Sequence, residues 1–113
     1  MGDEIMKILI IEDDNIIRSG VSYILSSNGY EVLDCKLIRE AAALLTDNIF
    51  DLIISDIGLP DGNGLDFCSQ YKDIPFIVMS GWECSELAKA NGAKAYVKKP
   101  FGADDILTAI AAL

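Results

Sequence analysis

Short apolar runs rich in isoleucine, valine or leucine recur along the chain, and polar or turn-forming residues separate them. Runs of this length and composition are typical of β-strands that are buried on both faces of a sheet. The pattern predicts strands at about residues 7–12, 31–36, 51–55, 75–79 and 94–98.

The stretches between these runs carry apolar residues at helical spacing instead. In the first stretch Val21 and Leu25 are four positions apart, and the pattern ends at Asn28-Gly29, a typical signal for the end of a helix. Asn91-Gly92 ends the fourth stretch in the same way. We therefore predict helices near residues 15–27, 38–47, 64–71, 84–91 and 103–112.

Alternation of strands and helices predicts an α/β fold: a doubly wound parallel sheet, with helices on both faces and right-handed crossovers. A chain of 113 residues is long enough for one domain with a real core, but too short for two. We assign residues 7–113 to this domain. Residues 1–6 are predicted to be a short leader, because Gly2-Asp3-Glu4 breaks the apolar pattern.

Polar side chains follow four of the predicted strands. Glu12-Asp13-Asp14 comes after the first strand, Asp56 after the third, Ser80 after the fourth and Lys99 after the fifth. An acid that ends one strand is more often a turn or helix-cap residue than a ligand, so the order of the whole set is what matters. The carboxyl ends of parallel strands lie along one edge of the sheet, where ligands bind.

Acids gathered at one edge repel one another unless a cation joins them. Mg2+ prefers oxygen ligands, usually one or two carboxylates together with phosphate oxygens and water. We expect Asp13 and Asp56 to bind Mg2+ directly and Glu12 to act through a bound water. A carboxylate can attack a phosphoryl group and hold it as an acyl phosphate, so Asp56 is the predicted phosphoacceptor. Lys99 then pairs with the phosphoryl group, and the Ser80 hydroxyl donates to it.

The composition of the chain excludes several classes of binding partner and of functional site. Nine basic against eighteen acidic residues give a net charge of −9, which argues against nucleic-acid binding. The apolar stretches are far shorter than the roughly 20 residues of a membrane span, and no secretory signal precedes them, so we predict a cytoplasmic protein that does not bind membranes. The absence of histidine excludes a histidine phosphocarrier, a Ser-His-Asp triad and histidine-ligated zinc. The three cysteines are predicted to be reduced, buried thiols.

Four motifs together make the chain resemble a CheY-like response-regulator receiver domain of two-component signalling over residues 7–113. The motifs are Ile10-Ile11-Glu12-Asp13-Asp14, Asp51-Leu52-Ile53-Ile54-Ser55-Asp56-Ile57-Gly58-Leu59-Pro60, Met79-Ser80-Gly81 and Tyr96-Val97-Lys98-Lys99-Pro100-Phe101. The resemblance implies a flavodoxin-like (βα)5 fold with sheet order 2-1-3-4-5. It also implies Mg2+-dependent phosphotransfer to Asp56 from a sensor histidine kinase or a histidine phosphotransfer protein. Such a domain signals rather than acting on other substrates, although it catalyses its own phosphorylation and dephosphorylation.

The resemblance also implies roles for individual residues. Glu12-Asp13 corresponds to the acidic pair, Ser80 to the switch hydroxyl and Tyr96 to the switch aromatic residue. The main-chain carbonyl of Gly58 is the expected further metal ligand. Together with the tight turn needed to aim Lys99 at the acids, the resemblance predicts a cis peptide bond between Lys99 and Pro100.

The resemblance also bears on the lifetime of the phosphoryl group and on the surface that binds an output partner. Gly58 and Trp82 occupy two variable positions at which the family tunes the lifetime of the phosphoryl group; Trp82 is otherwise an ordinary loop aromatic packed on the surface. The segment from Ser80 to Lys99 is shorter than is usual in the family, which predicts a shortened (clipped) fourth helix. That helix, the fifth strand and the fifth helix form the face expected to bind a homodimer partner or an output domain or protein.

Two alternatives from other classes remain at this point. One is a pseudo-receiver, a binding module that keeps the fold without being phosphorylated; intact Asp56, Asp13 and Lys99 count against it. The other is a small flavodoxin-like electron carrier. Its flavin phosphate needs a hydroxyl-rich loop after the first strand, whereas the loop here is Glu12-Asp13-Asp14-Asn15 and would repel it.

Overall fold

A computed structural model of the chain describes residues 5–113, so residues 1–4 of the predicted leader lie outside the described residues. All five predicted strands are present, each within one residue of its expected bounds. They are β1 (Lys7–Ile11), β2 (Glu31–Cys35), β3 (Leu52–Asp56), β6 (Phe76–Ser80) and β7 (Ala95–Lys98).

The five predicted helices are present as well. They are α1 (Asn15–Ser27), α2 (Ile38–Asp47), α3 (Gly64–Ser69), α4 (Ser85–Ala90) and α5 (Ala103–Ala111). As expected from the Asn-Gly signals, Gly29 and Gly92 directly follow the C-cap residues of α1 and α4 with φ values of 89° and 94°. Only glycine adopts such values without strain. The clipped fourth helix is confirmed, because α4 has six residues.

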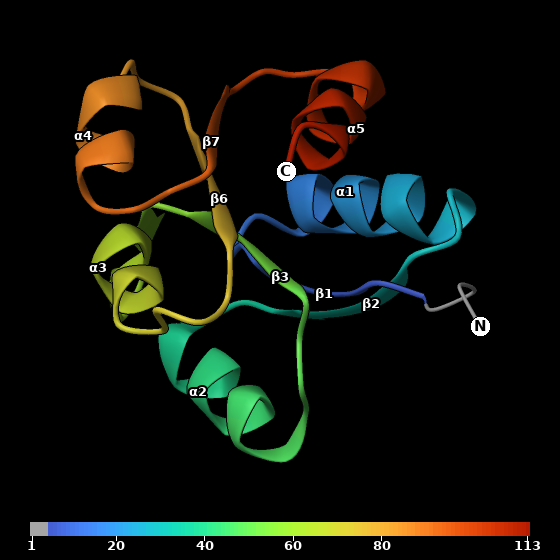
Figure 1. Ribbon diagram of the computed structural model, residues 1–113, viewed down its shortest axis with the longest axis horizontal. Coiled ribbons are helices and arrows are strands. Elements are labelled where there is room, and N and C mark those ends of the chain that lie inside the picture. Colours follow the sequence, from blue (N-terminus) through green and yellow to red (C-terminus); the bar gives the residue numbers. More distant parts are fainter. Residues whose placement is uncertain (1–4) are drawn as a thin grey trace.

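The five strands form one parallel sheet in the order β2-β1-β3-β6-β7. Numbered among the sheet strands alone, this is the predicted order 2-1-3-4-5. The direction of winding therefore reverses between β1 and β3, and the carboxyl ends of these two strands lie side by side. Figure 1 shows α1 and α5 on one side of the sheet and α2, α3 and α4 on the other. The predicted doubly wound fold is confirmed.

The core consists of two layers, one on each face of the sheet. Alternate residues of β1 point into different layers: Leu9 packs with the α2, α3 and α4 side, and Ile10 with the α1 and α5 side. Both side chains are completely buried, as the continuous apolar runs predict. Because layers pack on both faces of the central strands, the backbone at their carboxyl ends is held in a defined position.

One element was not predicted: a two-stranded antiparallel hairpin, β4 (Gly58–Leu59) and β5 (Gly62–Asn63), between β3 and α3. Its strands are too short to carry a period in the sequence. Asp61 at its tip accepts hydrogen bonds from the main-chain N–H groups of Ile38 at 2.8 Å and Arg39 at 3.0 Å. Since the N-cap of α2 has no side-chain cap of its own, the hairpin supplies one. This tie holds the loop after β3 against α2.

The three cysteines are free and buried, as predicted. Burial raises the pKa of the Cys35 and Cys68 thiols to about 12, so both stay protonated at neutral pH. Among the residues described, no helix combines the length and the apolar character needed to cross a membrane.

Candidate functional site

An acidic cluster lies at the carboxyl edge of the sheet, where the sequence places it. Glu12 and Asp13 follow β1, Asp56 is the last residue of β3, and these two strands are hydrogen-bonded neighbours. One carboxylate oxygen from each of the three acids lies within 4.8 Å of the others. The fold therefore brings together three acids from positions 12 to 56 of the chain.

Glu12 is the buried member of the cluster, with only 1% of its surface exposed. Its Oε1 accepts a hydrogen bond from Lys99 Nζ at 2.6 Å, and its Oε2 accepts one from the main-chain N–H of Asp14 at 3.0 Å. Burial raises the pKa of Glu12, and the charge of Asp56 adds to this effect, against the lowering by its hydrogen-bond donors. The buried Glu12 carboxylate thus holds the Lys99 ammonium in place.

Lys99 joins the acids into one network. Its ammonium lies 3.1 Å from Oδ2 of Asp56 as well as 2.6 Å from Glu12. Burial lowers the pKa of Lys99, but the hydrogen bond to Glu12 and the two carboxylate charges outweigh burial and raise it overall. The lysine is therefore charged at neutral pH.

The turn after β7 aims Lys99 back at the acids. The Lys99 main-chain N–H donates to the Ser80 carbonyl oxygen at 2.7 Å, which extends the pairing of β7 with β6. The predicted cis peptide bond between Lys99 and Pro100 is present.

Asp56 and Asp13 face the open side of the cluster. Asp56 is half-buried, and its Oδ1 accepts a hydrogen bond from the main-chain N–H of Ile57 at 2.8 Å, which fixes the plane of the carboxylate. Asp13 is exposed. A Cβ at Gly58, two residues after Asp56, would meet no atom within 4 Å, so the space at this position is open.

The donor set suits a hard divalent cation. Three carboxylates against one ammonium leave a formal charge of −2 at the site, and all the candidate ligand atoms are oxygens. Mg2+ takes oxygen ligands and keeps several waters, which an exposed rim allows. Asp14 does not belong to the set: its Oδ1 accepts from the N–H groups of Ile16 and Ile17 and caps α1.

Ser80, Trp82 and Tyr96 form a chain of hydrogen bonds next to the cluster. The Trp82 main-chain N–H donates to Ser80 Oγ at 3.1 Å, and the Tyr96 hydroxyl donates to the Trp82 main-chain oxygen at 2.6 Å. The backbone of Trp82 therefore links the two predicted switch residues, while 55% of the residue's surface is exposed. This link could not be predicted from the sequence, because contacts of main-chain atoms do not depend on a particular residue type.

Gly64 is a further residue of the site, which was placed from the sequence only at the start of the third predicted helix. It begins α3, is buried, and packs against the main chain of Asp56 so closely that a Cβ would overlap the Asp56 carbonyl oxygen. Its N–H donates to the Ile57 oxygen at 2.7 Å. The Asn63-Gly64 pair, in which Asn63 caps α3, was the available signal.

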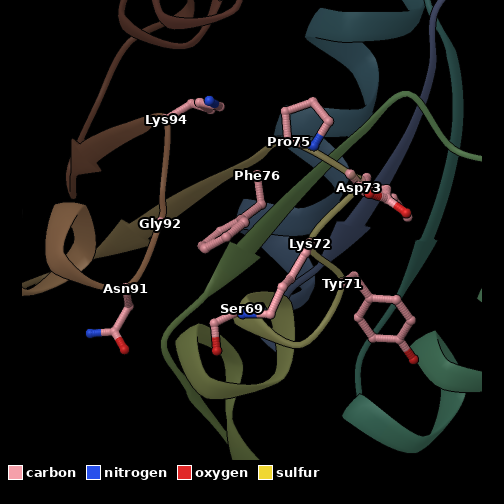
Figure 2. Close-up of a pocket in the computed structure, with 10 residues that line it drawn as sticks. Ser69, Tyr71, Lys72, Asp73, Pro75, Phe76, Asn91, Gly92 and Lys94 are labelled. Atoms are coloured by element: carbon pink, nitrogen blue, oxygen red, sulfur yellow. The ribbon is translucent and has the colours of Figure 1, made fainter.

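A pocket of about 430 Å³ lies at the opposite edge of the sheet, between the loops that precede β6 and β7. Figure 2 shows that its polar side chains do not converge: Asp73 and Lys94 point away from the buried ring of Phe76, in different directions. The convergent polar groups of the described chain lie at the carboxyl edge instead.

Comparison with known proteins shows the family of this chain. The family described as "Response regulator receiver domain" matches residues 8–111. PhoP of Salmonella typhimurium, a virulence transcriptional regulatory protein, is 30% identical over 96% of this chain, which spans 51% of the length of PhoP.

Solved structures agree. Chemotaxis response regulator CheY4 of Vibrio cholerae has a TM-score of 0.88 and 32% identity, over 96% of this chain and 98% of CheY4. The non-phosphorylated receiver domain of HemR from Leptospira biflexa has a TM-score of 0.84 and 32% identity, over 95% of this chain and 92% of that domain. Sequence motifs, sheet order and family match agree, and the chain belongs to the response-regulator receiver domain family.

Proposed function

We propose that this receiver domain, residues 7–113, accepts a phosphoryl group on Asp56 in a Mg2+-dependent reaction and changes conformation to signal. The donor is the phosphohistidine of a sensor histidine kinase or of a histidine phosphotransfer protein in the cytoplasm. The observation that supports this most is the position of Asp56, with Lys99 at 3.1 Å on one oxygen and two further carboxylates within reach.

Asp13, Asp56 and the main-chain carbonyl of Gly58 hold Mg2+ directly in this proposal, and Glu12 acts through a water. Glu12 Oε1 already accepts from Lys99 at 2.6 Å, which favours the indirect role. When bound, Mg2+ supplies positive charge that lets an anionic donor approach the acids. Lys99 places a second positive charge beside the oxygens of the transferred group.

The chemical step uses Asp56 as the nucleophile. One of its oxygens attacks phosphorus, and a new O–P bond forms as the P–N bond to the donor histidine breaks. The bonding electrons leave with the imidazole nitrogen, which takes up a proton. Dephosphorylation is the attack of water on the same phosphorus, and the Asp56 carboxylate leaves.

The experiment that tests the proposal is phosphorylation by a small donor. Incubation with acetyl phosphate and Mg2+ should increase the intact mass by one phosphoryl group, and chelation of the metal should prevent it. Hydroxylamine should release the phosphoryl group as inorganic phosphate, because it attacks the acyl carbon of an acyl phosphate, and it should leave a hydroxamate in place of the aspartyl phosphate. An unchanged mass under these conditions would favour the pseudo-receiver, which keeps the fold as a binding module. A colourless protein would argue against the flavin carrier, which the acidic loop already disfavours.

The conformational switch involves Ser80 and Tyr96. In the conformation described here, Ser80 Oγ accepts from the Trp82 N–H at 3.1 Å. We infer that the hydroxyl turns to the phosphoryl group on phosphorylation, and that Tyr96 moves into the space it leaves. Tyr96 lies on β7. The change would thus reach the α4–β7–α5 face, where a homodimer partner or an output domain would bind.

Ser80→Ala should uncouple the switch from the chemistry. The variant keeps Asp56 and Lys99, so acetyl phosphate should still label it, but no hydroxyl is left to follow the phosphoryl group. The ring-proton NMR signals of Tyr96 should shift on phosphorylation in the unchanged chain and stay in place in the variant. Ser69→Ala, on α3, is the matched control and should behave as the unchanged chain. Equal shifts in both variants would contradict the coupling.

Trp82 and Gly58 are the proposed determinants of phosphoryl lifetime. The position of Gly58 is open, and glycine has no side chain to orient a water. In this proposal the large indole of Trp82 excludes the attacking water. Trp82→Ser should therefore speed dephosphorylation severalfold without loss of labelling. The hydrogen bonds of Trp82 to Ser80 and Tyr96 use main-chain atoms, so the substitution preserves them.

The measurement is the rate of phosphoryl loss with Mg2+ present and no phosphatase. Leu87→Ser removes another exposed apolar side chain from the same segment, on α4, and is the control. If both variants lose the phosphoryl group at the rate of the unchanged chain, Trp82 is a surface aromatic only.

A further inference from the structure

Arg18 lies in α1 and contacts the loop that carries the acidic pair. Its Nη1 donates to the main-chain oxygen of Glu12 at 2.9 Å, and its Nη2 donates to Asn15 Oδ1 at 2.7 Å. The oxygen of Glu12 belongs to the peptide bond between Glu12 and Asp13. The guanidinium therefore fixes the orientation of the peptide unit that immediately precedes the exposed acid of the cluster.

The guanidinium is itself held in place. Only 12% of the Arg18 side chain is exposed, and its Nε lies 3.6 Å from Oδ1 of Asp34 on β2. The other oxygen of Asp34 accepts from the Ser22 hydroxyl at 2.7 Å, one turn further along α1. Arg18 thus contacts the acidic loop, helix α1 and strand β2 at once. A planar, forked cation suits such a set of acceptors, whereas an ammonium can satisfy them only in part.

We propose that Arg18 is a positioning residue of the divalent-cation site, and that it acts through the Glu12–Asp13 peptide rather than by touching the ion. This inference rests on the proposed function, because it presumes that Asp13 and Asp56 bind Mg2+. Asp13 is exposed, so little besides its backbone orients it toward the cluster. Loss of a residue that orients a metal ligand without touching the metal commonly changes the metal affinity by about one to two orders of magnitude.

Positioning and simple electrostatics predict opposite effects, which makes the inference testable. Arg18 is a cation close to a cation site, so its charge alone opposes Mg2+ binding. If charge were its only influence, removal of Arg18 would tighten Mg2+ binding. If Arg18 positions the ligand, its removal weakens Mg2+ binding even though the net charge of the protein becomes more negative.

The experiment is a titration of the full chain with Mg2+, followed by the amide NMR signals of the loops around Asp13 and Asp56. Arg18→Met should raise the dissociation constant about tenfold. Arg18→Lys keeps the charge but loses the fork, so its dissociation constant should also rise, by less. Arg39→Met removes the other arginine of the chain, which is exposed on α2, and should leave Mg2+ affinity nearly unchanged.

Three outcomes would overturn the inference. The first is tighter Mg2+ binding by Arg18→Met together with unchanged affinity in Arg18→Lys, which would assign Arg18 a charge effect alone. The second is a lower melting temperature of both variants with the Mg2+ affinity of the unchanged chain, which would leave Arg18 a structural role only. If Arg18→Met does not fold, unaltered affinity in Arg18→Lys has the same meaning. Absence of Mg2+ binding by the unchanged chain is a different result, since it contradicts the metal site itself.

Discussion

Asp56→Asn should abolish phosphorylation by acetyl phosphate while leaving the fold intact. The asparagine side chain has the same shape, and its Oδ1 can still accept from the Ile57 N–H that now holds the carboxylate at 2.8 Å. It has no anionic oxygen to attack phosphorus, however, and an amide is a poor nucleophile. The loss of labelling should therefore be complete rather than partial.

The substitution also removes one of the three negative charges of the cluster. The attraction between the site and a divalent cation falls with it, so Mg2+ should stabilise the variant less than the unchanged chain. Asp104→Asn is the matched control, because this aspartate is exposed in the first turn of α5. We expect the control to be labelled normally and to keep its Mg2+ response.

Intact-mass measurement decides whether Asp56 or another acid is the phosphoacceptor. A phosphoryl mass on Asp56→Asn, located by peptide mapping to Asp13 or another acid, would mean that a different residue is the acceptor. A variant that is unlabelled and also unfolded by circular dichroism would not support the prediction, and the thermal melting curve is therefore part of the experiment.

The fold was predictable because its central strands are buried on both faces. Continuous apolar runs and helical spacing carry this information directly in the sequence. The hairpin Gly58–Asn63 could not be predicted, since two-residue strands are too short to show a periodic pattern in the sequence. The third helix ends at Ser69, two residues before the expected end, and local signals rarely fix such boundaries.

The membership of the acidic cluster and different metal-binding roles for Glu12 and Asp13 were predicted from the sequence, but the contacts that distinguish these acids were not. The three consecutive acids, Glu12-Asp13-Asp14, offer the same chemical group, so the sequence does not show which of them is buried. In the folded chain the first is buried against Lys99, the second is exposed beside Asp56, and the third caps α1. The main-chain oxygen of Glu12, within this run of acids, accepts a hydrogen bond from Arg18, which lies six residues further along the chain in α1.

Gly64→Ala should be strongly destabilising, and it tests how closely the loop after β3 must pack on the phosphoacceptor. A Cβ at this position would overlap the carbonyl oxygen of Asp56 and lie 2.5 Å from Ser55 Oγ. The main obstacle is backbone at the end of a buried central strand, so it cannot swing aside as a flexible side chain would. Relief requires α3 to shift away from β3, which would strain the hydrogen bond from Gly64 N–H to Ile57.

Overpacking typically costs about 1–3 kcal/mol, and an overlap with backbone belongs at the upper end of this range, against the roughly 5–15 kcal/mol by which a domain is stable. Gly20→Ala is the matched control: Gly20 lies inside α1, and a Cβ there meets nothing within 4 Å. Alanine is better than glycine in a helix interior by roughly 0.5–1 kcal/mol, so this variant should gain stability. Urea unfolding of both variants should thus give changes of opposite sign. A Gly64→Ala variant as stable as the unchanged chain would mean that α3 moves freely on the sheet, and that its close packing does not hold Asp56 in place.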